Sequence, residues 1–80
     1  MENSTILFKK ADFLTKFLDY ELAILDQEED LFTVWNLYNE EAQDCVFTGN
    51  FKETDDYLND MLERMHLTEK WNRQMEKREN

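Results

Sequence analysis

Proline is absent from this sequence of 80 residues, and glycine occurs once, at Gly49. Because these two residue types mark most irregular turns, their scarcity predicts short connections between regular elements. Cysteine also occurs once, at Cys45, so the chain cannot form an internal disulfide bond. Cys45 falls within an apolar strand pattern, and we expect it to be a small buried residue in a reducing compartment.

Long hydrophobic runs are missing as well. No apolar run approaches the roughly 20 residues that a membrane-spanning helix requires. A signal peptide begins with basic residues before its apolar region, whereas here Lys9 and Lys10 follow the apolar Ile6–Phe8. We therefore expect a soluble, cytoplasmic protein that does not bind membranes.

Basic residues are few over most of the chain, whose net charge is −10. Between Asp19 and Glu63 fourteen acidic residues stand against the single base Lys52, whereas from Arg64 onward five bases outnumber three acids. An acidic body of this kind repels phosphates, and we expect no direct binding of nucleic acid.

Metal sites are not supported by the spacing of possible ligands. Asp26, Glu28 and Asp30 alternate like the start of a calcium-binding loop. However, Leu31 stands at the sixth position, which requires glycine, and Leu37 at the twelfth, which requires a bidentate glutamate. Zinc would have only one histidine and one cysteine, far apart in the sequence. We expect no metal and no cofactor.

Catalysis is equally unsupported. His66 follows a predicted helix and suits a partner of the helix C-terminus better than a catalytic base. Paired carboxylates can be drawn from the nineteen acids, but no basic or apolar pocket is evident that would separate their pKa values. The sequence predicts a protein that is not an enzyme.

The centre of the chain predicts antiparallel strands. Residues 31–38 combine β-branched and aromatic residues with apolar groups on both faces, which is typical of a central strand with one face beneath helices. Residues 44–49 form the next strand, ended by Gly49. Residues 20–24 alternate as a short strand, followed by an acidic turn at 26–30. The alternative for this segment is one helix extending to Gln27, which leaves a two-stranded sheet.

Helices are predicted on both sides of these strands. Phe13, Leu14, Phe17 and Leu18 have helical spacing, which predicts a helix over residues 11–19, preceded by an irregular, frayed segment at residues 1–5. Asn50 with Glu53 forms a capping box that opens a second helix. Its apolar stripe consists of Phe51, Thr54, Leu58, Met61, Leu62 and Met65, with Tyr57 at the margin. The fold class is therefore α+β: a single domain over residues 1–80, with a helix, a small antiparallel sheet of three (or two) strands, a second helix, and a helical extension at residues 67–80.

The extension presents a second apolar stripe. Leu67, Trp71 and Met75 are four residues apart and lie opposite the stripe of the preceding helix. Either the helix kinks near Thr68 or it continues with a second apolar face, and in both cases the stripe needs a cover. The cover is the first helix or another molecule. The change from acidic to basic charge at the same place favours self-association as a homodimer.

The charge distribution points to protein–protein interaction. Acidic surfaces attract basic ones, and basic protein surfaces are chiefly those that hold nucleic acid. The chain resembles, in size, charge and α+β pattern, the small acidic proteins of phages and mobile elements that block restriction, CRISPR or repair enzymes. That resemblance implies an anti-defence inhibitor, a DNA mimic that binds a nucleic-acid-handling protein. The acids predicted to bind the partner are Asp26, Glu28, Glu29, Asp30, Glu40, Glu41, Asp44, Asp55, Asp56 and Asp60. The alternative is an acidic adaptor or self-associating domain that uses Leu67, Trp71 and Met75, with the acids serving only solubility.

Overall fold

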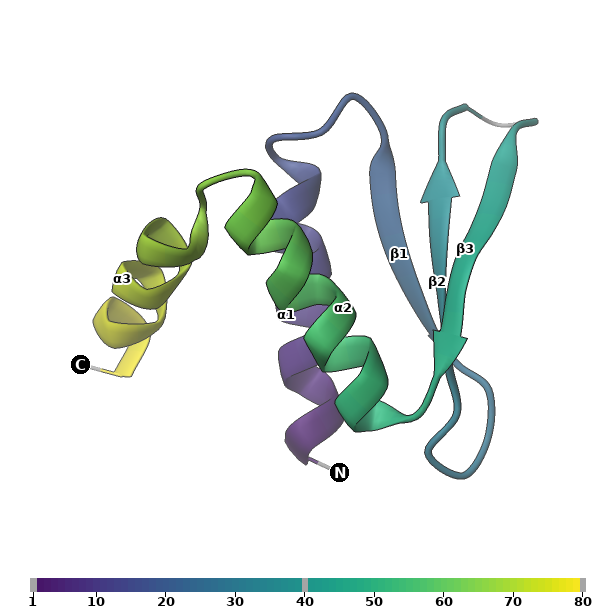
Figure 1. Ribbon diagram of the computed structural model, residues 1–80, viewed down its shortest axis with the longest axis horizontal. Helices are drawn as coiled ribbons and strands as arrows, with labels where there is room; N and C mark the ends of the chain where they lie inside the picture. The colour runs from purple at the N-terminus through teal and green to yellow at the C-terminus, as the bar shows by residue number, and fades with distance from the viewer. Residues whose placement is uncertain (1, 40, 80) are drawn as a thin grey trace.

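The computed structural model describes residues 2–39 and 41–79, and the side chains of residues 4–39 and 41–76. Over these residues the chain forms a helix, a three-stranded antiparallel sheet and then two helices, which confirms the predicted α+β fold (Figure 1). The elements are α1 (Glu2–Thr15), β1 (Glu21–Asp26), β2 (Phe32–Leu37), β3 (Gln43–Gly49), α2 (Phe51–Arg64) and α3 (Thr68–Glu79).

The sheet is a meander in the order β1-β2-β3, so β2 is the central strand, as its apolar residues on both faces predict. The strand alternative for residues 20–24 is confirmed, because β1 pairs with β2 from Glu21 opposite Leu37 to Asp26 opposite Phe32. A third strand is physically favoured here, since a two-stranded sheet is only marginally stable by itself.

The turn between β1 and β2 is tight and acidic, as predicted. Glu29 and Asp30 have φ values of 45° and 61°, and the N–H of Leu31 donates to the carbonyl oxygen of Glu28 at 3.1 Å. Two successive residues of positive φ match the strand twist of a two-residue hairpin, but non-glycine residues adopt this conformation at a cost. A carboxylate oxygen of Asp30 accepts a hydrogen bond from the N–H of Phe51 at 3.2 Å, which ties the turn to the start of α2.

The first helix differs from the prediction at both ends. It begins at Glu2 and ends at Thr15, whereas helical spacing placed it at residues 11–19 with an irregular segment before it. The buried apolar stripe of α1 already starts at Leu7, which is fully buried, as is Leu14. The helix therefore extends further toward the N-terminus than predicted and includes residues 2–5. Met1 lies outside the described residues.

The end of α1 is set by the sheet. The hydroxyl of Thr15 donates to the carbonyl oxygen of Ala11 at 2.8 Å and accepts the N–H of Leu22 at 2.9 Å. Thr15 thus holds the free edge of β1 against α1, and the chain must leave the helix in order to enter the strand. Phe17, predicted to lie on the buried face, is therefore beyond the helix and 43% exposed.

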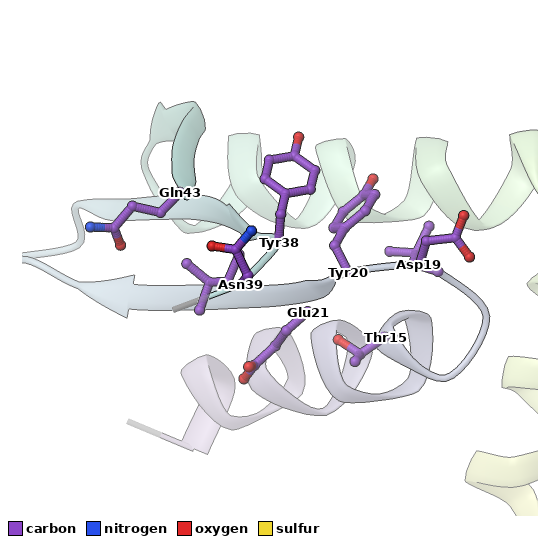
Figure 2. Close-up of a pocket in the computed structure, with 9 residues that line it drawn as sticks. Thr15, Asp19, Tyr20, Glu21, Tyr38, Asn39 and Gln43 are labelled. Carbon is purple, nitrogen blue, oxygen red and sulfur yellow. The ribbon is translucent and has the colours of Figure 1, made fainter. Parts of the chain in front are cut away.

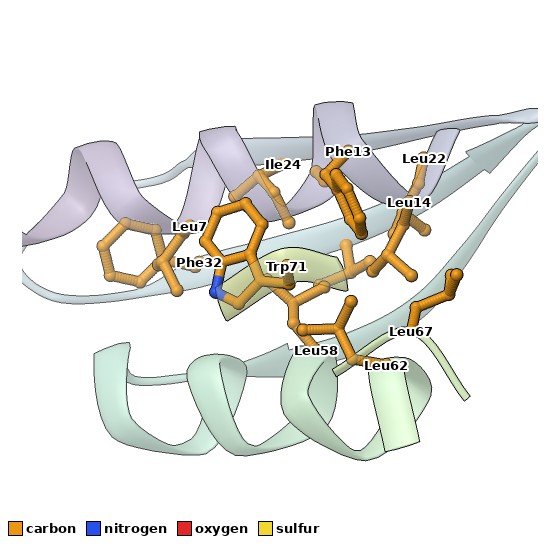
Figure 3. Close-up of a cluster of buried hydrophobic side chains, with 12 residues drawn as sticks. Leu7, Phe13, Leu14, Leu22, Ile24, Phe32, Leu58, Leu62, Leu67 and Trp71 are labelled. Carbon is orange, nitrogen blue, oxygen red and sulfur yellow. The ribbon is translucent and has the colours of Figure 1, made fainter. Parts of the chain in front are cut away.

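The core lies between the sheet and the pair α1 and α2, and α3 packs on the other side of that pair (Figures 1 and 3). The inward-facing residues of the sheet are Leu22 and Ile24 of β1 and Phe32 and Val34 of β2, all buried. The other buried hydrophobic residues are Leu7, Ala11, Phe13, Leu14, Leu58, Leu62, Leu67 and Trp71.

A bulge in β3 decides the position of Cys45. Val34 pairs with Phe47 and Trp35 pairs with Cys45, so Val46 is an extra residue between the two pairs. Without the bulge, Cys45 and Phe47 would share one face of the strand. With it, Phe47 faces α2 and Cys45 lies on the opposite face, where it is exposed. The prediction of a buried Cys45 is therefore wrong.

The capping box that opens α2 is confirmed. The Asn50 side chain accepts the N–H of Glu53 at 2.8 Å, and the Glu53 carboxylate accepts the N–H of Asn50 at 2.9 Å. Gly49 precedes this box, and a Cβ atom there would lie 2.7 Å from the Glu53 carboxylate oxygen. The single glycine thus leaves room for the capping box, since an added Cβ atom would also lie 3.0 Å from the Cβ atom of Glu53 and from the ring of Phe47. The stripe of α2 is also confirmed, with Thr54, Leu58 and Leu62 buried.

The helix breaks between α2 and α3, which confirms the kink alternative. His66 has a φ of 60°, its N–H donates to Glu63, and the N–H of Leu67 donates to the carbonyl oxygen of Leu62 at 2.7 Å. These bonds form a Schellman motif, in which the residue after the helix adopts the left-handed conformation. The reversal turns α3 back toward α1, so the chain itself covers the second stripe.

Leu67 and Trp71 are consequently 6% and 5% exposed, and Met75 is partly buried against the same core. The rings of Trp71 and Phe13 meet edge to face at 5.4 Å between centroids. This burial corrects the assignment of Leu67, Trp71 and Met75 as an exposed partner-binding face and removes the reason given for self-association through it.

His66→Gly is expected to raise the free energy of unfolding by about 0.5–1 kcal/mol. Glycine removes the steric cost of the left-handed conformation, which exceeds the entropy that glycine gains in the unfolded chain. Urea unfolding followed by circular dichroism measures the difference. His66→Ala is the matched control, because it removes the imidazole but keeps the Cβ atom, and equal stabilisation of both variants would contradict the explanation.

Candidate functional site

The sheet has one open face, which α1, α2 and α3 leave uncovered in the described chain (Figure 1). The pairing of the strands places three rows of residues on it: Glu21–Leu37–Gln43, Ala23–Trp35–Cys45 and Leu25–Thr33–Thr48. We call this surface, together with Leu31 just before β2, the open face. It is the uncovered counterpart of the face that forms the core.

Trp35 lies at the centre of the open face in a fixed position. Its indole N–H donates to the hydroxyl of Thr33 at 3.0 Å, and the amide of Gln27 donates to the same oxygen at 3.3 Å. Thr33 is buried beneath these groups, and Trp35 itself is half-buried. A tethered indole of this kind offers a large, rigid apolar surface to a partner at little conformational cost.

Exposed aliphatic side chains extend this apolar surface. Leu25 is 49% exposed and Leu31 is 39% exposed. Single exposed leucines are ordinary on protein surfaces, but leucines beside a tryptophan on an uncovered sheet make this surface a candidate for contact with a partner.

Acidic residues stand at both ends of the open face. Asp26, Glu28 and Glu29 lie at the β1–β2 turn and are exposed, with no described base at ion-pair distance. At the opposite end lies Glu41, which is likewise exposed and without a described ion-pair partner. Asp44 is exposed as well, but it pairs with Asn36, as Asp26 pairs with Phe32, so both belong to the rows of the sheet on the helix side. Glu40, also predicted to bind the partner, lies outside the described residues.

The four remaining predicted acids have partners in the chain. Asp30 accepts the N–H of Phe51. The three acids of α2 form ion pairs: Asp55 with Lys10 at 2.6 Å, Asp56 with Lys52 at 3.0 Å and Asp60 with Arg64 at 2.8 Å. These acids do not join the open face in one array. Two of the pairs have the i, i+4 spacing of neighbours on a helix, so the sequence contained a signal that they are neutralised.

The Asp56 hydrogen bond and charge raise the pKa of Lys52, which keeps this exposed pair ionised up to high pH. On the covered side of the sheet, burial raises the pKa of Tyr57, and Tyr20 raises it further while Arg64 opposes both. The ring of Tyr57 stacks on Phe47 at 4.7 Å between centroids. These shifts belong to packing and surface pairing, because neither group lies in an enclosed pocket with a nucleophile.

A hollow of about 630 Å³ adjoins the open face where α1 ends and β1 begins. It is lined by Thr15, Leu18, Asp19, Tyr20, Glu21, Leu37, Tyr38, Asn39 and Gln43. Figure 2 shows the rings of Tyr20 and Tyr38 side by side, with the carboxylates of Asp19 and Glu21 to either side of Tyr20. The lining combines carboxylates, hydroxyls and amides without a lysine, arginine, cysteine or histidine, which suits binding of a cationic group.

The prediction from sequence missed Asp19, Glu21 and Trp35 as members of a binding surface. The signal was present for Trp35, since alternation along β2 separates Leu31, Trp35 and Leu37 from the buried Phe32 and Val34. Its meaning depended on which face the helices cover, which is a property of the packed structure.

Other classes of site find no support among the described residues. No group of three or more histidine, cysteine, aspartate or glutamate side chains in the described part of the chain is arranged to hold a metal ion. Within residues 2–39 and 41–79, none of the helices is long and apolar enough to span a membrane. Comparison of the chain with protein-family models, with curated proteins and with solved structures gives no significant match.

Proposed function

We propose that this chain is a non-enzymatic protein-interaction module that binds a basic partner protein through the open face. The observation that carries the proposal is the uncovered sheet surface around Trp35, with exposed acids at both ends. Apolar contact at the centre supplies affinity, while the acids at the ends steer and orient a basic partner. The hollow beside Glu21 gives a lysine or arginine side chain of that partner a place to enter.

The partner we propose is a protein that handles nucleic acid, whose basic surface the acids occupy in place of phosphates. The acids that carry this mimicry are Glu28, Glu29 and Glu41, joined by Asp19 and Glu21. The paired acids of α2 are left out, because a carboxylate already neutralised by its own base contributes little to an external field. An inhibitor of this kind would compete with nucleic acid for the partner.

A capture experiment tests the surface. The immobilised protein is exposed to a lysate of the organism that encodes it, alongside Trp35→Ser and Glu21→Lys variants. We expect both variants to lose a partner that the wild type retains, with a weakening of at least about tenfold, because a central aromatic residue commonly contributes 2 kcal/mol or more, roughly. Glu63→Lys is the matched control, since it makes the same charge change at an exposed residue of α2.

Competition with duplex DNA then tests mimicry. Release of the captured protein by DNA, and weaker binding at high salt, are the expected results. A partner held equally by the wild type and both open-face variants would show that the open face is not the site. If replacing these acids by lysine alters only the solubility of the protein, the acids serve solubility alone, which is the alternative derived from the sequence.

A further inference from the structure

Four of the nine bases of this acidic chain gather between α1 and α3. Two adjacent hollows there, of about 430 and 420 Å³, share Phe13, Lys16 and Gln74 in their walls. Lys9 lines the first, and Lys70 and Arg73 line the second. We call this surface the basic groove. It joins residues of the N-terminal helix to residues more than fifty positions later.

The bases of the groove are largely available. Lys9, Lys16 and Lys70 have no carboxylate partner among the described side chains, and Arg73 has only a long pair with Glu69 at 3.8 Å. Lys10, by contrast, points to α2 and is paired with Asp55. One acid, Asp12, lines the groove. The local charge is therefore opposite in sign to that of the whole chain.

The groove also offers aromatic surface and an unused donor. Phe13 lies 5.3 Å from the exposed Phe17, and the Lys70 ammonium lies 5.5 Å from the centre of the Phe17 ring. Trp71 lines the groove and is 5% exposed, yet its indole N–H donates to no described residue. Since no described side-chain nitrogen is both buried and unpaired, this N–H is open to solvent. This N–H is therefore free to donate a hydrogen bond to a carboxylate that enters the groove.

We propose that the basic groove binds the acidic β1–β2 turn of a second copy of this chain. The turn carries exposed carboxylates at Asp26, Glu28 and Glu29 between the exposed leucines 25 and 31. Carboxylates can meet Lys16, Lys70 and the Trp71 N–H while a leucine packs on Phe17. The turn is held in one conformation by its own hydrogen bonds and by Asp30, so little entropy is lost when it docks.

The two surfaces lie on different sides of the molecule. Figure 1 shows the β1–β2 turn projecting below the sheet and α3 at the opposite side of the helix pair. One copy therefore cannot fill its own groove, and the contact between copies is head to tail. A contact of this type extends into an open chain unless its rotation closes a ring.

Two variants, each of which disrupts only one of the two contacting surfaces, test the contact. Lys16→Glu/Lys70→Glu destroys the groove but keeps the turn, and Glu28→Lys/Glu29→Lys destroys the turn but keeps the groove. We expect each variant alone to sediment as a monomer, and a mixture of the two to form a one-to-one dimer. The wild type should form larger, concentration-dependent species, with an affinity at least about tenfold above that of either variant with itself.

Lys52→Glu is the matched control for the groove variant, because Lys52 is an exposed base on α2 outside the groove. It should associate like the wild type. A wild type that remains monomeric up to millimolar concentration, or a mixture that forms no dimer, would overturn the proposal. So would association of either variant alone at wild-type strength.

This contact is separable from the proposed function. The groove variant leaves the open face unchanged, so it should still capture the basic partner. A wild type that captures the partner but does not self-associate refutes only the contact between copies. A wild type that self-associates but captures no partner refutes only the proposed function.

Discussion

Trp71→Ala is expected to lower the free energy of unfolding by about 3–5 kcal/mol, the usual cost of truncating a buried tryptophan. Trp71 fills the space between α1 and α3, where it contacts Phe13 and the core (Figure 3). For a domain of this size such a loss is a large part of the total stability, so the variant should be partly unfolded at room temperature. Urea unfolding followed by circular dichroism measures it.

Trp35→Ala is the matched control for this change. It removes the same type of side chain from the open face, where Trp35 is half-buried. The loss in free energy of unfolding should be clearly smaller, because less apolar surface is buried there than at Trp71. The melting temperature of Trp71→Ala should also show no dependence on protein concentration beyond that of the wild type. Near-wild-type stability with abolished association would contradict the intramolecular cover seen in the structure.

Asp55→Ala is expected to lower the free energy of unfolding by about 2–4 kcal/mol. The Lys10 ammonium is buried between α1 and α2, where it donates to Asp55 at 2.6 Å and to the amide oxygen of Asn59 at 2.7 Å. Without Asp55 the buried charge keeps only a neutral acceptor. The expected value lies at the lower end for a broken buried pair because the Asp55 side chain is 25% exposed and water compensates in part.

Two variants separate charge burial from other causes. Asp56→Ala removes the neighbouring carboxylate, whose pair with Lys52 is exposed on both sides, and should cost less than about 1 kcal/mol. Lys10→Met combined with Asp55→Leu should recover most of the stability lost in Asp55→Ala, because no unpaired charge then remains. Chemical denaturation of all three variants measures this, and a double variant as unstable as Asp55→Ala would show that packing, not charge, is responsible.

Local features of the fold followed from the sequence. The strand pattern of residues 31–38, the capping box of Asn50 and Glu53, and the stripe of α2 each depend on neighbours within a few residues. Such signals survive in the folded chain because nothing elsewhere competes with them. For residues 20–24 the sequence favoured a strand only slightly over a continued helix. The strand prediction is confirmed, and a third strand stabilises the sheet.

The candidate site was less predictable. Counting acidic residues identified the β1–β2 turn and the residues near the β2–β3 turn as candidate binding residues. It did not show that these two groups lie at opposite ends of the sheet. It also could not tell free acids from paired ones: Asp55 is neutralised by Lys10, which lies 45 positions earlier. The apolar centre at Trp35 was visible as alternation, without any indication of which face the helices cover.

What the sequence by itself determined is the order and type of the elements, since periodicity and capping act over one or two turns of chain. What only the tertiary structure decided is where the faces point. The bulge at Val46 exposed Cys45, the left-handed His66 turned Trp71 into the core, and the packing of α3 on α1 created the basic groove. Each outcome depends on the sum of contacts between distant segments, in which one extra residue in a strand or one reversed turn changes which side chains meet.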